Sequence, residues 1–160
     1  MKRYLPLVFL LVTVDQVTKF LVKHSFELYE SKEVIPGFFN LTFVLNPGAA
    51  FGMLARMNES YRQLFFIAVT ILAILAVIFL MYKELGHRLR TFSYALILSG
   101  AIGNFIDRLY LGKVVDFLDF YIKGYHWPAF NVADSSITIG IILLFIDIIF
   151  NKEKKDAHNA

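Results

Sequence analysis

The sequence predicts an all-α membrane protein with a small β element: a bundle of four transmembrane helices and a small β-sheet on the outer side of the membrane. Of the 160 residues, 58% are hydrophobic and the mean hydropathy is +0.60, whereas soluble domains are roughly 45 to 50% apolar. Four apolar runs approach the roughly 20 residues that a helix needs to cross a bilayer. They cover about residues 4–22, 64–82, 92–110 and 133–150. The length suits a single integral membrane domain, residues 1–160.

The first apolar run follows Lys2 and Arg3, as the core of a removable signal peptide would. It contains Asp15, Gln16 and Lys19 and has no small-x-small cleavage site. We therefore interpret it as a retained helix. The second run carries no charge and is the clearest span, while the polar second half of the third predicts that this half faces protein rather than lipid.

Basic residues predict the orientation of the helices. They gather before the first run, between the second and third runs, and after the fourth: Lys2, Arg3, Lys83, Arg88, Arg90, Lys152, Lys154 and Lys155. By the positive-inside rule these three segments are cytoplasmic, and so are both termini. The connections over about 24–63 and 111–132 then lie on the outer side.

The first outer connection predicts the β-sheet, over about residues 34–58. Within it, polar and apolar residues alternate from Phe39 to Asn46, and aromatic and β-branched residues are frequent. Pro36-Gly37 and Pro47-Gly48 mark turns on either side. The apolar face of this segment could pack on the helix bundle or lie on the membrane surface.

Composition excludes several classes of site. The chain has no cysteine, which removes disulfides, thiolate nucleophiles and cysteine-based metal sites. Its four histidines are scattered without an HExxH spacing, so we expect no metal and no cofactor. The net charge of +3 comes from cations at the ends of apolar runs, which indicates membrane orientation rather than nucleic-acid binding.

Charged residues inside the first helix need an explanation, because an aspartate or lysine at a helix centre costs about 2.5 to 3.5 kcal/mol on insertion scales. Asp15 and Lys19 are four residues apart and share one helix face. An ion pair that ties the helix to its neighbours near the outer boundary explains both residues. A direct catalytic role is the alternative.

The third helix carries a stripe of small and polar residues. Gly100, Asn104, Asp107 and Arg108 recur at three- and four-residue spacing, with Gly103 at the edge of the stripe. Such a stripe favours close helix packing with hydrogen bonds across the contact. The planar guanidinium of Arg108 could instead bind a phosphate or a loop carbonyl.

Carboxylates also gather in the second outer connection. Asp116 and Asp119 lie among apolar residues, and Asp134 stands at the start of the fourth helix, where alone it could serve as an N-cap. If Asp116 folds back against Asp134 at the membrane boundary, the two carboxylates could not both ionise readily. One could activate water while the other protonates a leaving amine, which is the chemistry of peptide hydrolysis. Spacing alone does not choose between Asp116 and Asp119, and it leaves Asp107 as a third candidate.

Five short segments carry a family resemblance: Asp15–Lys19 (DQVTK), Asn46–Phe51 (NPGAAF), Gly103–Arg108 (GNFIDR), Val114–Phe117 (VVDF) and Phe130–Asp134 (FNVAD). In this order, and with four spans, they resemble lipoprotein signal peptidase, or signal peptidase II, a bacterial inner-membrane family. Each segment alone is weak. The five together cover nearly the whole chain and are specific.

The resemblance implies an aspartyl endopeptidase with four transmembrane helices and an outer β-cradle. Such an enzyme cleaves diacylglyceryl-modified prolipoproteins before the lipidated cysteine, at the outer face of the inner membrane. The resemblance implies that Asp116 and Asp134 form the catalytic pair, and it demotes Asp119. The implied partners are prolipoproteins, membrane lipid and cyclic peptide inhibitors of the globomycin type, with no cofactor.

The resemblance also implies supporting residues in or beside the site: Asn46, Asn104, Arg108, Asn131, Asp15 and Lys19. Of these, Asn46 and Asn131 are expected close to the substrate backbone, and Asp107 is expected to position Arg108.

Two other functions compete with the peptidase. A transporter or proton-conducting protein could use Asp15, Lys19, Asp107 and Asp147 as a relay. However, the polar residues gather toward the outer half, and Asp147 is expected at the inner end near Lys152 and Lys154. A noncatalytic assembly factor would not explain why carboxylates cluster at one membrane boundary.

Overall fold

The computed structural model describes residues 2–48 and 57–158, with side chains as far as residue 150. Within this part, a short 3-10 helix η1 (Lys2–Tyr4) leads into α1 (Leu5–Ser25), followed by α2 (Glu59–Lys83), α3 (Arg88–Leu111) and α4 (Val132–His158). Four segments are long and apolar enough to span a membrane: Lys2–Ser25, Glu59–Lys83, Arg88–Leu111 and Val132–Phe150. The predicted four-helix membrane fold is therefore confirmed.

α2 and α3 begin four to five residues earlier than the apolar runs that predict them. α2 begins at Glu59, five residues before Leu64, because the side chain of Asn58 accepts a hydrogen bond of 2.9 Å from the Ser60 backbone N–H and caps the helix. α3 likewise begins at Arg88. These first turns are polar, so hydropathy marks the membrane-spanning part and not the whole helix.

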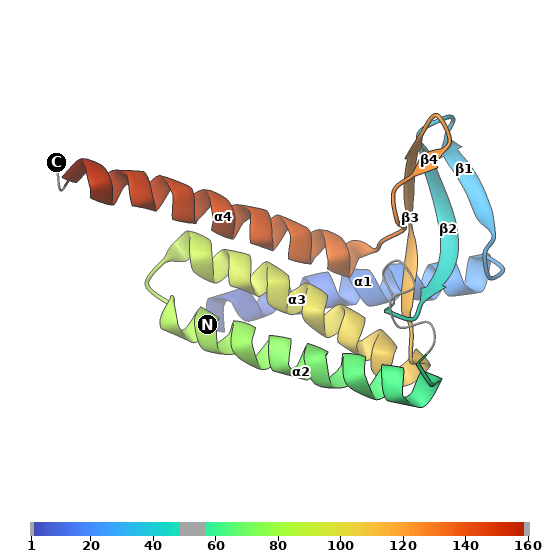
Figure 1. Ribbon diagram of the computed structural model, residues 1–160, viewed down its shortest axis with the longest axis horizontal. Coiled ribbons are helices and arrows are strands. Elements are labelled where there is room, and N and C mark those ends of the chain that lie inside the picture. The colour runs from blue at the N-terminus through green and yellow to red at the C-terminus, as the bar shows by residue number, and fades with distance from the viewer. Residues whose placement is uncertain (1, 49–56, 159–160) are drawn as a thin grey trace.

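α3 is the central helix, and it packs against the other three (Figure 1). Small residues allow this close contact. A side chain at Gly100 would collide with the backbone carbonyl of Ala133 on α4, and one at Gly140 would lie 2.7 Å from the backbone carbonyl oxygen of Ser93. Gly100 and Asn104 of the predicted stripe thus pack against α4, as the composition of the stripe predicts, whereas its other end, Asp107 and Arg108, contacts other elements.

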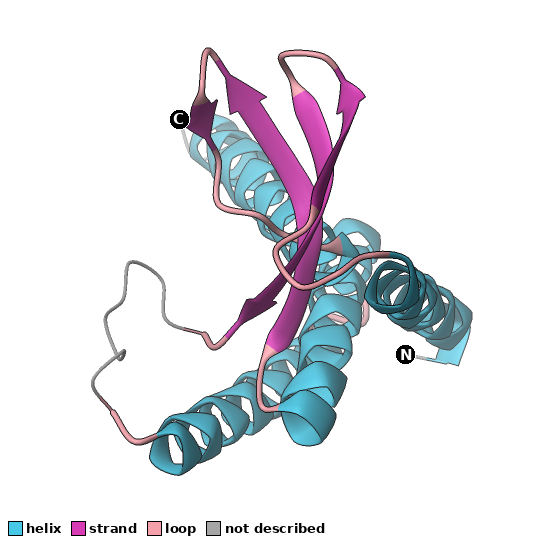
Figure 2. Ribbon diagram, turned by 90° about the vertical axis from the view of Figure 1, so that its right-hand side faces the viewer, coloured by secondary structure: helices cyan, strands magenta, loops and turns pink. Residues whose placement is uncertain are grey.

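A four-stranded antiparallel sheet stands at one end of the bundle. It contains β1 (Ser31–Ile35), β2 (Phe39–Asn46), β3 (Val114–Ile122) and β4 (Tyr125–His126), in the order β1-β2-β3-β4. Its strands cross the helix axes, with β1 farthest from the bundle and β3 close to it (Figure 1). Figure 2 looks along the helices from the sheet side and shows the strands running across the end of the bundle.

The sheet is larger than the predicted one. β1 and β2 come from the predicted connection, although β1 begins before residue 34; residues 49–56 lie outside the described part. β3 and β4 come from the second outer connection, which was not predicted to form strands. β2 and β3 pair from Phe39↔Phe120 to Asn46↔Val114, and a pairing between such distant segments leaves no local signal.

The apolar side of the sheet packs on the bundle rather than only on the membrane surface. Phe43 of β2 forms a buried cluster with Val115 and Phe117 of β3 and with Val22 near the end of α1. This contact fixes the sheet against α1 and thereby sets the position of β3 over the ends of α3 and α4.

Candidate active site

Asp116 of β3 and Asp134 of α4 meet at the junction of the sheet and the bundle. The amide nitrogen of Asn131 donates a hydrogen bond of 2.7 Å to Asp116, and the Asn131 backbone N–H donates one of 3.2 Å to Asp134. One asparagine thus contacts both carboxylates. Asp116 is only 2% exposed, and Asn131 is fully buried. The structure therefore brings the two predicted catalytic residues together.

The turn before α4 holds Asp134 in place. The side-chain oxygen of Asn131 accepts a hydrogen bond of 2.9 Å from the Asp134 backbone N–H, and Asp134 in turn accepts one from the Asn131 backbone N–H. This reciprocal pattern is a capping box with Asn131 as the N-cap and Asp134 three residues later. The suggestion that Asp134 is itself the N-cap is wrong, since it belongs to the first turn of the helix.

Asn46 of β2 contacts Asp116 from the other side. Its amide nitrogen donates a hydrogen bond of 2.9 Å to Asp116, and its side-chain oxygen accepts one of 2.8 Å from the Gly48 backbone N–H. The second contact fixes the orientation of the amide, so that its N–H groups face the carboxylate.

The surroundings of Asp116 favour its protonated form. Burial raises the pKa of the Asp116 carboxyl from 3.8 to about 7. The hydrogen bond from Asn46 opposes this rise, while the negative charge of Asp134 adds to it; the hydrogen bond from Asn131 and the positive charge of Lys19 act against it. A carboxyl that titrates near neutral pH is suited to donate or accept a proton.

Strand alternation separates Asp116 from Asp119. The two residues are three apart in β3, so their side chains lie on opposite faces of the sheet. Asp119 accepts a hydrogen bond of 3.0 Å from the Asn40 amide and pairs with His126 at 2.9 Å. It therefore has structural partners away from Asp134.

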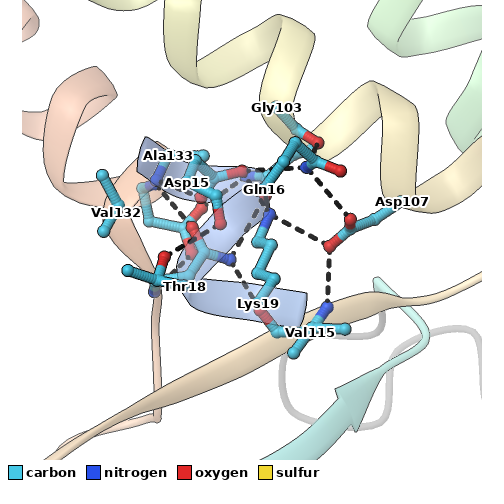
Figure 3. A network of polar contacts seen from close by, with 12 residues as sticks. Asp15, Gln16, Thr18, Lys19, Gly103, Asp107, Val115, Val132 and Ala133 are labelled. Carbon is cyan, nitrogen blue, oxygen red and sulfur yellow. Dashed lines mark hydrogen bonds and ion pairs between the residues drawn. The ribbon is translucent and has the colours of Figure 1, made fainter. Parts of the chain in front are cut away.

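Lys19 joins three polar groups from two helices (Figure 3). Its ammonium lies 2.9 Å from Asp15 and 3.0 Å from Asp107, and it donates a hydrogen bond of 3.0 Å to the side-chain oxygen of Asn104. The predicted ion pair between Asp15 and Lys19 is present, and Lys19 is only 2% exposed. Because an ammonium can only donate, it fixes the Asn104 amide so that the amide nitrogen donates to Asp134 at 2.7 Å.

The carboxylates around Lys19 also hold the site elements. Asp15 accepts a hydrogen bond of 2.9 Å from the Ala133 backbone N–H at the start of α4. Asp107 accepts one of 3.0 Å from the Val115 backbone N–H, next to Asp116 in β3. Gln16 connects the two, because its amide donates to both carboxylates at 3.1 and 3.3 Å (Figure 3). Asp107 thus binds Lys19 and β3 rather than positioning Arg108.

Arg108 lies on the α2 side of the site. Its guanidinium donates a long hydrogen bond of 3.4 Å to the Thr70 hydroxyl and lies 5.7 Å from the centre of the Phe66 ring. Among the described residues it makes no direct hydrogen bond to Asp116 or Asp134. It is therefore the one predicted supporting residue that the structure does not join to this hydrogen-bond network.

Sequence reasoning gave no role to Gln16 or Thr70. Gln16 belongs to the first of the five segments and is a polar residue within an apolar helix, which is a usable signal. Thr70 is the only serine or threonine in the uncharged second run, and such a residue gives almost no signal. Asp147 binds Arg90 at 2.6 Å; its predicted neighbours Lys152 and Lys154 have side chains outside the described part.

An open hollow of about 510 Å³ lies beside Asp134. Its walls come from the loop after β4 and from one side of α4: Trp127, Pro128, Ala129, Phe130, Asp134, Ser135, Thr138 and Ile139. Apart from Asp134 the wall is mostly apolar, so an apolar chain that enters along α4 would reach a carboxylate.

Comparison with known proteins identifies the family of this site. The family profile described as signal peptidase (SPase) II matches residues 7–150. Proteins named lipoprotein signal peptidase are similar to the chain over most of both lengths. The one from Desulforapulum autotrophicum is 49% identical and covers 89% of each chain. The one from Syntrophus aciditrophicus is 46% identical, over 94% of this chain and 98% of its own.

Solved structures agree with the sequence comparison. One structure, described as a bacterial membrane enzyme, has a TM-score of 0.85 and 37% identity, with 97% of this chain and 92% of the other covered. A second, with the same description, has a TM-score of 0.82 and 38% identity over 92% and 93%. The chain therefore belongs to the signal peptidase II family of membrane peptidases.

Proposed function

We propose that the chain removes the signal peptide of diacylglyceryl-modified prolipoproteins by cleaving before the lipidated cysteine, with Asp116 and Asp134 as its catalytic pair. Its family supports the removal of prolipoprotein signal peptides. One observation carries the catalytic assignment: Asn131 hydrogen-bonds both carboxylates at once. This common partner supports the proposal that the two acids work as a pair.

The two aspartates take different parts in the reaction. Asp134 is the member that activates water, because it accepts hydrogen bonds from Asn104 and Asn131 and lies in the first turn of α4 beside the open hollow. Asp116 is the protonated member, in keeping with its raised pKa. Asp134 removes a proton from water, the resulting hydroxide attacks the peptide carbonyl, and Asp116 donates a proton to the reacting carbonyl oxygen or to the leaving amine.

The supporting residues hold this pair in place. Asn46 and Asn131 orient Asp116, while Asn104 orients Asp134 and is itself fixed by Lys19. Asn46 is partly exposed and is expected beside the substrate backbone, whereas Asn131 is fully buried and acts through Asp116. Arg108 faces the site from the α2 side. There its guanidinium is available for a carbonyl or ester oxygen of the substrate.

The substrate reaches the site from the lipid. The hollow along α4 ends at Asp134, and its apolar wall suits either an acyl chain or the apolar signal peptide. Cyclic peptides of the globomycin type would compete for the same site. The chain works as a single integral membrane domain in the bacterial cytoplasmic membrane, with both termini in the cytoplasm and the sheet at the outer face.

The test uses purified protein in detergent and a diacylglyceryl-modified precursor. Asp116→Asn and Asp134→Asn should each lower turnover by roughly 10²-fold or more, because loss of a general acid or base typically costs 10²–10⁴-fold. The wild-type protein should retain its activity in the presence of a chelator. Turnover is read as release of the signal peptide.

Asp119→Asn is the matched control, since it changes an aspartate of the same strand that points to the opposite face. It should keep turnover near the wild-type rate. Full activity in either Asp116→Asn or Asp134→Asn, with melting temperatures unchanged, would disprove the catalytic assignment.

A further inference from the structure

The β3–β4 hairpin ends in a tight turn that exposes apolar side chains. Its two central residues, Lys123 and Gly124, have φ values of +51° and +80°. Positive φ at both positions is typical of a type I′ turn, which joins strands with little distortion. The strands therefore stay paired up to Ile122 and Tyr125 at the end of the hairpin.

The two faces of this hairpin differ in polarity. Tyr121 and His126 pair on one face, where their rings stack with centres 4.8 Å apart and their polar atoms bind Glu33 and Asp119. Ile122 and Tyr125 pair on the other face. The polar atoms of Tyr121 and His126 thus find their partners within the sheet.

The side chains on the apolar face, in contrast, have no such partners among the described residues. Ile122 is 63% exposed and Tyr125 is 85% exposed. Trp127 follows on the same face, since its backbone N–H bonds the carbonyl of Phe120, and it is 70% exposed. Three large side chains are thus exposed together at the end of the sheet, a patch that we call the hairpin tip (Ile122, Tyr125 and Trp127).

The hairpin tip lies beside the first turns of α4, the fourth apolar span. In Figure 1, α1 runs past β3 toward the outer side, and the loop after β4 returns to α4 along the side of the sheet that is nearer the helices. α4 exposes Ile139, which shares the hollow beside Asp134 with Trp127. The hairpin tip therefore continues the apolar surface of α4.

We propose that the hairpin tip is an interfacial anchor that binds the lipid of the leaflet on the sheet side. Trp and Tyr favour the headgroup level of a bilayer, where their rings are partly apolar and their polar atoms stay hydrated. Lys123, exposed at the turn, can reach the lipid phosphates while the neighbouring side chains insert. The anchor holds the far end of β3 against the membrane while the near end carries Asp116. It does not depend on the catalytic assignment.

The chain offers a direct probe, because Trp127 is its only tryptophan. In liposomes of phosphatidylcholine and phosphatidylglycerol, lipids brominated near the glycerol should quench Trp127 emission more strongly than lipids brominated near the chain ends. Iodide in the aqueous phase should quench weakly. Strong quenching by iodide without quenching by brominated lipid would place the tip in water and overturn the proposal.

Variants separate anchoring from folding and from catalysis. The double change Ile122→Ser and Tyr125→Ser should shift Trp127 emission to the red and reduce its quenching by brominated lipid. Val34→Ser, at an exposed apolar position on β1, should leave both signals unchanged. Asp116→Asn should also leave the quenching unchanged, so a failed catalytic assignment would not affect this test. Equal quenching in the double variant and the wild type would contradict the anchor.

Discussion

Asp116 shows how a single carboxyl acquires its chemistry from its position in a strand. Its neighbours in β3 are apolar and buried, so the carboxyl is desolvated, yet Asn46 and Asn131 supply hydrogen bonds that keep it in place. Desolvation outweighs these bonds, and the pKa rises to about 7. The same strand turns Asp119 to the opposite face, where it binds Asn40 and His126 instead.

The raised pKa of Asp116 predicts the pH dependence of turnover. If Asp116 acts as the protonated member, kcat/KM should fall as the pH rises above about 7, because the acid is lost there. The fall should approach about tenfold per pH unit, as for a single ionisation. A pH profile of kcat/KM in detergent measures this. A rate that keeps increasing through the same range would show that Asp116 must be ionised.

Lys19 is the buried cation that supplies the counter-charge for two carboxylates, Asp15 and Asp107. Lys19→Met leaves Asp15 and Asp107 without their counter-charge, and breaking a buried ion pair typically costs about 3–5 kcal/mol. We expect a clear loss of thermal stability, accompanied by lower activity because Asn104 is no longer fixed. Differential scanning fluorimetry measures the stability.

Lys23→Met, one turn later on an exposed position of the same helix, is the control and should melt like the wild type. If Lys19→Met melts normally but is inactive, Lys19 serves the reaction and not the fold.

At the scale of elements, α3 acts as the platform on which α4 presents Asp134. The two helices touch at Gly100, where the Ala133 carbonyl occupies the space of a side chain, and Asp134 is the next residue. Asn104, one turn further along α3, then reaches Asp134. Close packing and the position of Asp134 therefore come from the same contact.

This contact predicts the effect of a single methyl group. Gly100→Ala should push α4 away from α3, with a loss of about 1–3 kcal/mol, typical of overpacking, and a fall in turnover as the contact between Asn104 and Asp134 lengthens. Gly86→Ala, in the turn between α2 and α3, adds the same methyl group in open space and should change neither property. Melting curves and turnover are measured for both variants. If Gly100→Ala and Gly86→Ala melt and react alike, α4 tolerates the shift.

The elements also show what the sequence could predict. Four spans were predictable because each must be apolar over the width of a bilayer, while polar first turns such as that of α2 were not. Asp116 and Asp134 were recognisable as members of matching segments, whereas physical reasoning alone left Asp119 and Asp107 open. The missing information was that Val114–Ile122 is a strand: its partner β2 lies far away in the sequence, and only the pairing shows which face each aspartate takes.

At the scale of the whole molecule, the sheet joins both outer connections above the bundle. β2 precedes α2 and β3 follows α3, so their pairing closes the chain over the ends of the helices (Figure 2). The site lies where this closure meets α1, α3 and α4. Its parts come from the beginning, the middle and the end of the chain.

The absence of cysteine from the sequence makes the proposed orientation simple to test. Lys32→Cys on β1 should react with a membrane-impermeant maleimide in intact spheroplasts. Gly86→Cys, in the turn at the other end of the bundle, should react only after the membrane is opened. Labelling of Gly86→Cys in sealed cells, with Lys32→Cys protected, would reverse the orientation.

The arrangement of charges in α1 has a consequence for biogenesis. Lys19 finds its first counter-ion one turn earlier in the same helix, so α1 can leave the translocon as a locally neutral segment before α3 has been synthesised. Asp107 joins only when α3 arrives, and the Ala133 backbone binds Asp15 only when α4 has been inserted. A nascent chain thus carries one of the two ion pairs of Lys19 from the start, and Asp134 of the proposed catalytic pair arrives only with the last span.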